Sequence, residues 1–166
     1  MAPFRDHQIH KLPIDGVYLV DLDVYIDTRG LVYEVIHGSD SFVNQIRQVY
    51  HVVNPRADTI RAFHVHKQLH DWFHISNGSA IFCLVDDREQ SPSYKSTVRV
   101  VLSARKPQLL VVPPGVYHGW MSLEPNTILT STASEEYNRE RPDEHRVPPD
   151  YFNELFGGTP WRIDAK

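Results

Sequence analysis

Short apolar runs, each closed by a turn residue, are the feature that most restricts what this chain can fold into. The runs are rich in Val, Ile, Thr, Tyr and Phe and cover residues 16–26, 31–37, 46–53, 59–66, 71–76, 80–86, 97–102, 108–112, 116–123 and 128–134. β-Branched and aromatic residues fit pleated strands, and most of these runs are too short for helices. Regular spacing of such strands predicts an all-β fold, either a sandwich or a barrel.

The pattern also predicts how the chain is divided. We expect a single domain over residues 1–166, because a chain of 166 residues with 41% hydrophobic content can bury one sizeable core. That core would span about residues 16–134, and the charged, proline-rich segment from residue 135 would run over the surface. Pro149 before residues 150–156 and Gly157 after them predict a short C-terminal helix. Asn77-Gly78 predicts a tight hairpin between its flanking strands.

Composition excludes several classes of partner. The net charge of −4 gives no broad basic surface, which argues against nucleic acid and anionic membranes. There is no apolar run long enough to span a membrane and no signal-peptide pattern at the start. A lone cysteine, Cys83, cannot form an internal disulfide and fits a reducing compartment. We therefore expect a cytoplasmic protein.

The stretch RAFHVHKQLHDWFHISNG, residues 61–78, concentrates the candidate chemistry. Alternation in a strand places His64 and His66 on one face, and the turn Pro113-Pro-Gly115 would aim His118 from a second strand. Two interpretations stay open: a hydrogen-bonded polar pocket without metal, or a metal site whose ligands would be His64, His66, Asp71 and His118. We expect no bound metal and no other cofactor.

A pocket histidine also suits acid–base chemistry. An imidazole titrates near neutrality and can remove a proton next to a carbonyl, so we predict His64 as a base. Its orientation needs an acceptor, for which Asp150 is a candidate that the residues alone do not pair with it. Positive side chains could bind phosphate groups; the candidates are Arg29, Arg61, Lys67 and Arg88.

Several separate segments carry a family resemblance. They are Asp27-Thr-Arg-Gly30 with Glu34, Arg61-Ala-Phe-His64 in place of R-G-x-H, Asp86-Asp-Arg88 with Ser91-Pro-Ser-Tyr94, Leu102-Ser103, and Pro113-Pro-Gly-Val-Tyr-His-Gly-Trp120. Over nearly its whole length the chain resembles the dTDP-4-dehydrorhamnose 3,5-epimerase family of cupin-fold nucleotide-sugar epimerases. The resemblance implies a double-stranded β-helix, the cupin jelly-roll barrel, and a homodimer formed through the N-terminal strands.

The resemblance also implies residue roles. The base would be His64, paired with Asp150, and the nucleotide would be held by Arg29, Glu34 and Arg61. We add His118 and Tyr137 to the catalytic candidates. Gln48, His66 and Lys67 are further candidates for substrate binding.

Two family features are not matched. The strand that should carry the proton-donating tyrosine reads Leu129-Thr-Ser-Thr-Ala133, and the lysine expected to stabilise the enolate is matched most nearly by Asp71. The donor could then be Tyr117, Tyr137 or water. The string His64-Val-His-Lys67 is also similar to that of the dTDP-4-keto-6-deoxyhexose 3,4-ketoisomerases.

The sequence therefore predicts an isomerase that epimerises a nucleotide-linked 4-keto sugar, for surface polysaccharide or a glycosylated metabolite, by His-mediated proton abstraction. The alternatives are a 3,4-ketoisomerase, a metal-binding cupin enzyme, and a sugar-nucleotide binding module without catalysis.

Overall fold

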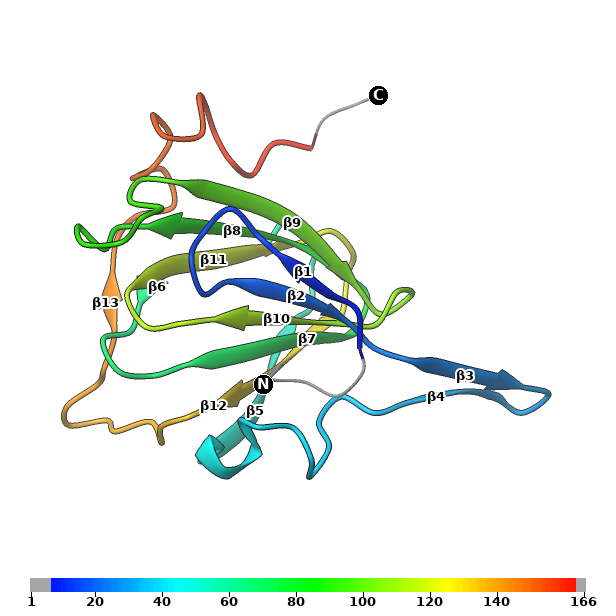
Figure 1. Cartoon of the computed structure of the whole chain (residues 1–166). Coiled ribbons are helices and arrows are strands. Elements are labelled where there is room, and N and C mark those ends of the chain that lie inside the picture. Colours follow the sequence, from blue (N-terminus) through cyan, green and yellow to red (C-terminus); the bar gives the residue numbers. More distant parts are fainter. Residues whose placement is uncertain (1–6, 164–166) are drawn as a thin grey trace.

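Two antiparallel sheets form the body of the protein in the computed structural model, which describes residues 7–163 (Figure 1). The six-stranded sheet has the order β1 (Ile9–Lys11), β2 (Tyr18–Asp21), β10 (Gln108–Val112), β7 (Asp71–Asn77), β12 (Thr127–Ala133) and β5 (Gln48–Asn54). The five-stranded sheet has the order β13 (His145–Arg146), β6 (Ile60–Val65), β11 (Val116–Ser122), β8 (Ser79–Asp86) and β9 (Thr97–Ser103). This is the predicted cupin-like jelly roll.

A separate hairpin projects from this body (Figure 1). It consists of β3 (Val24–Asp27) and β4 (Gly30–Tyr33), which pair only with each other among the described strands. A 3₁₀ turn at Val43–Gln45 leads from the hairpin segment into β5.

Alternation along the strands sorts side chains to the two faces of each sheet. On β7, Phe73 and Ile75 enter the core between the sheets, whereas Trp72 stacks on Phe42 at 4.7 Å on the outer face of the six-stranded sheet. On β6, Phe63 packs on the outer face of the five-stranded sheet. Three apolar clusters therefore form, which explains why the strands look hydrophobic on both faces in the sequence.

The chain switches sheets at Asn77-Gly78, contrary to the predicted hairpin. Gly78 adopts φ +77°, as a tight turn requires, but β7 pairs with β10 and β12 while β8 pairs with β9 and β11. Turn geometry is local, whereas the pairing partner is set by the apolar faces that each strand must bury. The fully buried β8 belongs in the middle of the second sheet.

The predicted C-terminal helix is also absent as a regular element within the described residues. Residues 150–157 form consecutive turns with a single i→i−4 bond, from the Phe156 N–H to the Phe152 carbonyl. Two prolines before this segment and the glycines at positions 157 and 158 leave too few residues to propagate a helix. The segment instead packs Phe152 and Trp161 over the outer face of the five-stranded sheet. No helix in the described part of the chain is long and apolar enough to cross a membrane.

Candidate active site

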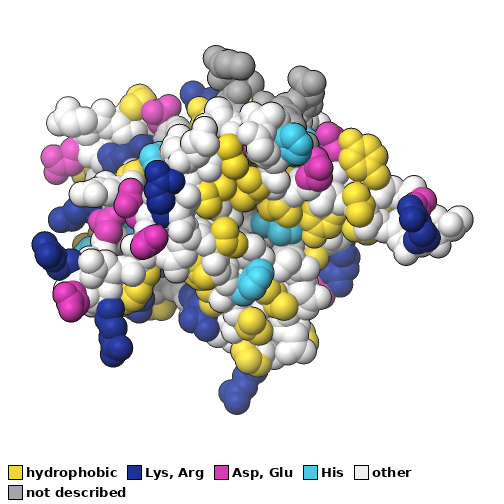
Figure 2. Space-filling model, turned by 90° about the horizontal axis from the view of Figure 1, so that it is seen from below, with side chains coloured by type: hydrophobic (Ala, Val, Ile, Leu, Met, Phe, Trp, Pro, Cys, Tyr) yellow, Lys and Arg dark blue, Asp and Glu magenta, His cyan; other side chains and the backbone are white. Residues whose placement is uncertain are grey.

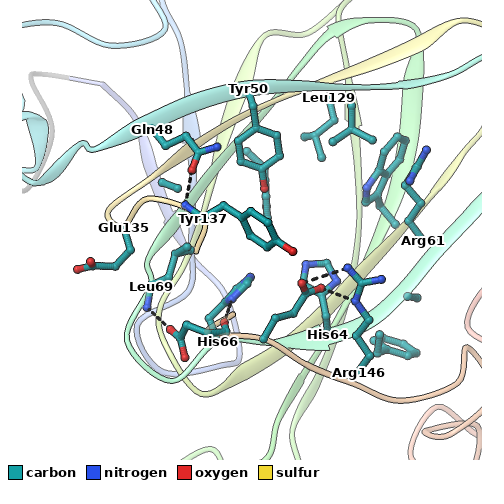
Figure 3. Close-up of a pocket in the computed structure, with 18 of the residues that line it drawn as sticks. Gln48, Tyr50, Arg61, His64, His66, Leu69, Leu129, Glu135, Tyr137 and Arg146 are labelled. Carbon is teal, nitrogen blue, oxygen red and sulfur yellow. Dashed lines mark hydrogen bonds and ion pairs between the residues drawn. The ribbon is translucent and has the colours of Figure 1, made fainter. Parts of the chain in front are cut away.

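A cavity of about 620 Å³ opens between β5 of one sheet and β6 of the other (Figure 3). Its walls come from β5, β6, β7, β11 and β12, and the segment 135–146 closes one side. This volume lies in the range of sites for small organic ligands. Among the residues predicted from the sequence, those that line the cavity are Gln48, Arg61, His64, His66 and Tyr137.

Strand β6 presents His64 and His66 to the cavity, as alternation predicts. Their ring centroids lie 5.4 Å apart, and His118 of the neighbouring β11 places its ring 4.1 Å from that of His64. The register of the two strands sets His118 directly opposite His64. The structure thus brings together the three imidazoles of the H-x-H stretch and the Pro-Pro-Gly turn.

Asp71 at the start of β7 completes this cluster. One carboxylate oxygen, Oδ2, lies 3.7 Å from His66 Nε2 and 3.5 Å from His118 Nε2, and the other, Oδ1, accepts a hydrogen bond from Ser131 at 3.2 Å. Both Asp71 and His118 are buried behind the cavity wall, at 1% and 2% exposure.

Burial sets the protonation of this cluster. It lowers the pKa of His64 to about 3, with repulsion from His66 and Arg146 adding to the effect. It also raises the pKa of Asp71 to about 8, which the bond from Ser131 only partly offsets. The His118 pKa is lowered by the same desolvation. At neutral pH, therefore, the His64 imidazole is in the neutral form that accepts a proton.

The expected partner of His64 does not reach it. Asp150 is exposed on the turn after two prolines, outside the residues that line the cavity, and its carboxylate has no hydrogen bond or ion pair within residues 7–163. The family pattern assigned this role to Asp150 from its order along the sequence. The path of the chain after residue 135, however, is set by contacts that a sequence does not reveal. Arg146, which pairs with His64 in the β13–β6 register, occupies that side instead.

Other candidates lie away from the cavity. Arg29 sits on the projecting hairpin, where it binds Asp27, and Glu34 follows that hairpin; neither lines the cavity. The Lys67 side chain is exposed, and the Lys67 backbone N–H donates to the Asp143 carboxylate. Tyr117 packs against Phe152 rather than in the cavity.

The Arg88 side chain is not available to bind a phosphate group. Its guanidinium is bound to the buried Asp86 through Nε at 2.8 Å and Nη2 at 2.9 Å.

The segment 135–146 supplies the predicted candidate Tyr137 and two charged residues that the sequence analysis did not assign. Tyr137 lies across the cavity between Tyr50 and His64, with its N–H held by Gln48 at 2.7 Å (Figure 3). Glu144 and Arg146 form an ion pair at 2.7 Å in the same wall. The high density of charge and aromatic residues was the available signal, but it is equally typical of a solvated loop.

Asp143 fixes the loop that follows the histidine strand. Its carboxylate accepts the N–H groups of Lys67, Gln68 and Leu69 at 3.0, 2.8 and 3.1 Å, and its carbonyl oxygen accepts a hydrogen bond from His66 Nδ1. Burial alone would raise the pKa of this carboxyl, but the three backbone donors outweigh it and lower the pKa. Asp143 therefore sets the orientation of the His66 ring.

Tyr50 is the second tyrosine of the cavity and was not predicted. It stands opposite Ser131 in the β5–β12 register, and its hydroxyl is hydrogen-bonded to that serine. Burial raises the pKa of the phenol, so it remains protonated. In the sequence it had the appearance of an ordinary strand residue.

Comparison with known proteins places this site in a family. The sequence model of the dTDP-4-dehydrorhamnose 3,5-epimerases matches residues 11–150. The chain belongs to this family. Its members are isomerases, and the chain is therefore an enzyme of the dTDP-sugar epimerase and isomerase class. The family predicted from the sequence is confirmed.

A relative by sequence agrees with this assignment, and solved structures share the fold. The chain is 32% identical over 139 residues to the spore coat polysaccharide biosynthesis protein SpsL of Bacillus subtilis, an alignment that covers 82% of the chain and 91% of SpsL. A dTDP sugar isomerase from Desulfovibrio desulfuricans shares the fold with a TM-score of 0.82 at 20% identity, over 93% of the chain and 97% of the isomerase. ChmJ is a 3'-monoepimerase from Streptomyces bikiniensis whose structure was solved with dTDP-quinovose. It has a TM-score of 0.77 at 22% identity, over 88% of the chain and 76% of ChmJ.

Proposed function

We propose that this enzyme epimerises a nucleotide-linked 4-keto sugar by removing a proton next to the ketone, with His64 as the base. The observation that carries the proposal is the neutral imidazole of His64 at the wall of a ligand-sized cavity in a chain of this family. A ketone acidifies the neighbouring C–H groups, and a positioned imidazole contributes about 10² to 10⁴-fold to such a proton transfer.

The cavity offers a site for the diphosphate of the substrate. Arg61 lines the wall beside His64 and donates through Nε to Asn54 Oδ1 at 2.7 Å, which holds the guanidinium plane in place. A guanidinium can bind phosphate oxygens in pairs. The negative charge of the bound diphosphate would raise the pKa of His64 from its low value and so make it a stronger base.

We assign Tyr137 as the donor that returns the proton. Its side chain lies across the cavity near His64, whereas the Tyr50 hydroxyl is engaged by Ser131 (Figure 3). A dTDP-sugar is the proposed substrate class, supported by the ligand that ChmJ binds. A place in surface polysaccharide synthesis is supported by the description of SpsL.

Deuterium exchange tests the proposal. Incubation with a dTDP-4-keto-6-deoxyhexose in D₂O, followed by NMR, should show deuterium entering at C3, at C5 or at both. Exchange should fall by about 10² to 10⁴-fold in His64→Ala. Tyr137→Phe should slow product formation, while Tyr50→Phe serves as the matched control. Undiminished exchange in His64→Ala would remove this residue from the role of base.

The same experiment separates the alternatives. Migration of the carbonyl from C4 to C3 would identify a 3,4-ketoisomerase. Binding of dTDP-, GDP-, UDP- and CDP-linked sugars without exchange into any of them would identify a binding module.

A further inference from the structure

His118 has an unpaired nitrogen in the interior of the protein. Its Nδ1–H donates to the carbonyl oxygen of Val116 at 3.0 Å, because a carbonyl can only accept. The lone pair of the neutral ring is then on Nε2, which is buried and has no hydrogen-bond partner within the described residues. This atom faces Asp71 Oδ2 at 3.5 Å.

His66 repeats the same arrangement. Its Nδ1 is fixed by the carbonyl oxygen of Asp143, which leaves its Nε2 facing the same Asp71 oxygen at 3.7 Å. The other oxygen of Asp71 is held by Ser131. Both distances to Oδ2 are too long for N–H···O hydrogen bonds, which lie near 2.7–3.2 Å. The two Nε2 lone pairs therefore face one and the same carboxylate oxygen.

In place of the expectation of no bound metal, we propose that His66, His118 and Asp71 bind a divalent transition-metal ion. Donors that share such an ion at about 2.0–2.2 Å lie about 3.0–3.5 Å apart, so the observed spacing needs only a small contraction. Imidazole and carboxylate suit Zn²⁺, Fe²⁺ and Mn²⁺. The hydrogen bonds to Val116, Asp143 and Ser131 are of the kind that orient metal ligands from behind.

His64 stands next to this site without being part of it. Its ligand atom lies within 4.8 Å of those of His66 and His118, and it lines the cavity where the substrate would bind. No hydrogen bond fixes either nitrogen of its ring within residues 7–163. This freedom distinguishes it from the other two imidazoles and suits a base that must accept and release a proton.

The ion would explain how the site manages without a positively charged side chain. Asp71 stands where the resemblance places a lysine that stabilises the enolate, so the chain has a carboxyl group where a cation is needed. A bound metal ion would supply that positive charge at the cavity wall, beside His64. This role for the ion rests on the proposed function, whereas its presence does not.

Elemental analysis of untagged protein, purified without added metal, tests the site. We expect close to one transition-metal ion per chain. His66→Ala, His118→Gln and Asp71→Asn should lose it, and Ser131→Ala should weaken metal affinity by about 10-fold or more. His51→Ala is the matched control, because His51 is an exposed histidine on β5 whose ring is hydrogen-bonded to Thr130. Far-UV circular dichroism checks that each variant is folded, and the part-exposed His66 is the substitution least expected to disturb the fold.

His64→Ala separates this proposal from the proposed function. It should keep its metal and lose deuterium exchange. Loss of metal in this variant would add His64 to the ligands and overturn its role as base. Wild-type protein that contains the metal ion but shows no deuterium exchange would support the metal site and overturn the proposed function. The metal site itself is overturned if wild-type protein contains no metal and, after chelator treatment, binds none of Zn²⁺, Mn²⁺, Fe²⁺ and Co²⁺ by calorimetry, or if all three ligand variants retain the ion.

Discussion

Asp86 is a fully buried carboxylate on β8 that is satisfied by its own neighbours in the chain. It accepts hydrogen bonds from Arg88 Nε at 2.8 Å, Ser91 Oγ at 2.5 Å and Ser93 Oγ at 2.6 Å. Burial alone would raise the pKa of this carboxyl, but these donors outweigh it and lower the pKa well below the usual value. A lowered folded-state pKa stabilises the protein above the unfolded value, and this contribution is lost as the pH falls.

Asp86→Asn should therefore lower the free energy of unfolding by about 2–3 kcal/mol at pH 7, because Arg88 loses its charged partner. The difference between wild type and variant should shrink as the pH falls below about 4, near the unfolded pKa of aspartate. Urea unfolding at pH 7, 5, 4 and 3 measures it. A difference that stays constant over this range would show that the charge of Asp86 does not contribute.

Individual residues show where sequence reasoning is strong and where it stops. The spacing of His64, His66 and Asp71, with His118 after a distant turn, was enough to predict their cluster, because strand periodicity fixes which side chains share a face. The partner of His64 could not be predicted. Whether Asp150 or Arg146 lies beside His64 depends on the course of an irregular segment. That course is set by contacts with β6 rather than by a local sequence pattern.

The pairing of β6 with β11 shows how two elements constrain each other. A Cβ at Gly119 would lie 2.3 Å from Ala62 Cβ and 2.8 Å from Ala62 Cα, on the strand that carries His64. The family pattern has glycine where this chain has Ala62, so the methyl group is accommodated by the missing side chain at position 119. The presence of alanine at position 62 is therefore explained only together with the glycine at position 119.

Gly119→Ala should thus destabilise the protein by about 1–3 kcal/mol through overpacking and should displace His64, which lowers kcat. Adding Ala62→Gly should recover part of both losses, since it removes the closer of the two contacts. A double-mutant cycle on unfolding free energy and on exchange rate measures the coupling. Strict additivity of the two substitutions would contradict the contact.

The positions of the strands were predicted better than the strands with which each one pairs. Strand positions followed from apolar runs, but the same tight turn at Asn77-Gly78 can join neighbours in one sheet or carry the chain to another. The choice depends on the whole set of faces to be buried, which no single turn encodes.

On the scale of the whole molecule, the β3–β4 hairpin exposes apolar side chains on both of its faces. Opposite pairs Tyr25–Val32 and Ile26–Leu31 lie on its two faces, and these four side chains are 66%, 65%, 77% and 55% exposed. Figure 2 shows hydrophobic side chains continuing from the body onto this projection. A hairpin that is apolar on both faces is not stable alone in water, so we propose that a second copy covers it.

The homodimer predicted from the sequence would also explain Arg29. This residue is near the hairpin tip, with its side chain 88% exposed and outside the cavity of its own chain. We propose that it binds the nucleotide in the cavity of a second copy. Sedimentation equilibrium at micromolar concentration should give twice the mass of the chain. Ile26→Lys and Val32→Lys, one on each face, should give monomers, while Val101→Lys on β9, which is 51% exposed, should leave the dimer intact.

Complementation tests whether Arg29 acts across the dimer. Arg29→Ala and His64→Ala homodimers should each exchange deuterium poorly. Unfolded together and refolded, they should form hybrids in which one cavity has both an intact His64 and an intact Arg29, so exchange should rise above that of either parent. No rise in a refolded mixture shown by mass spectrometry to contain hybrids would place Arg29 outside the partner's site. Wild-type protein that sediments as a monomer would instead contradict the dimer itself.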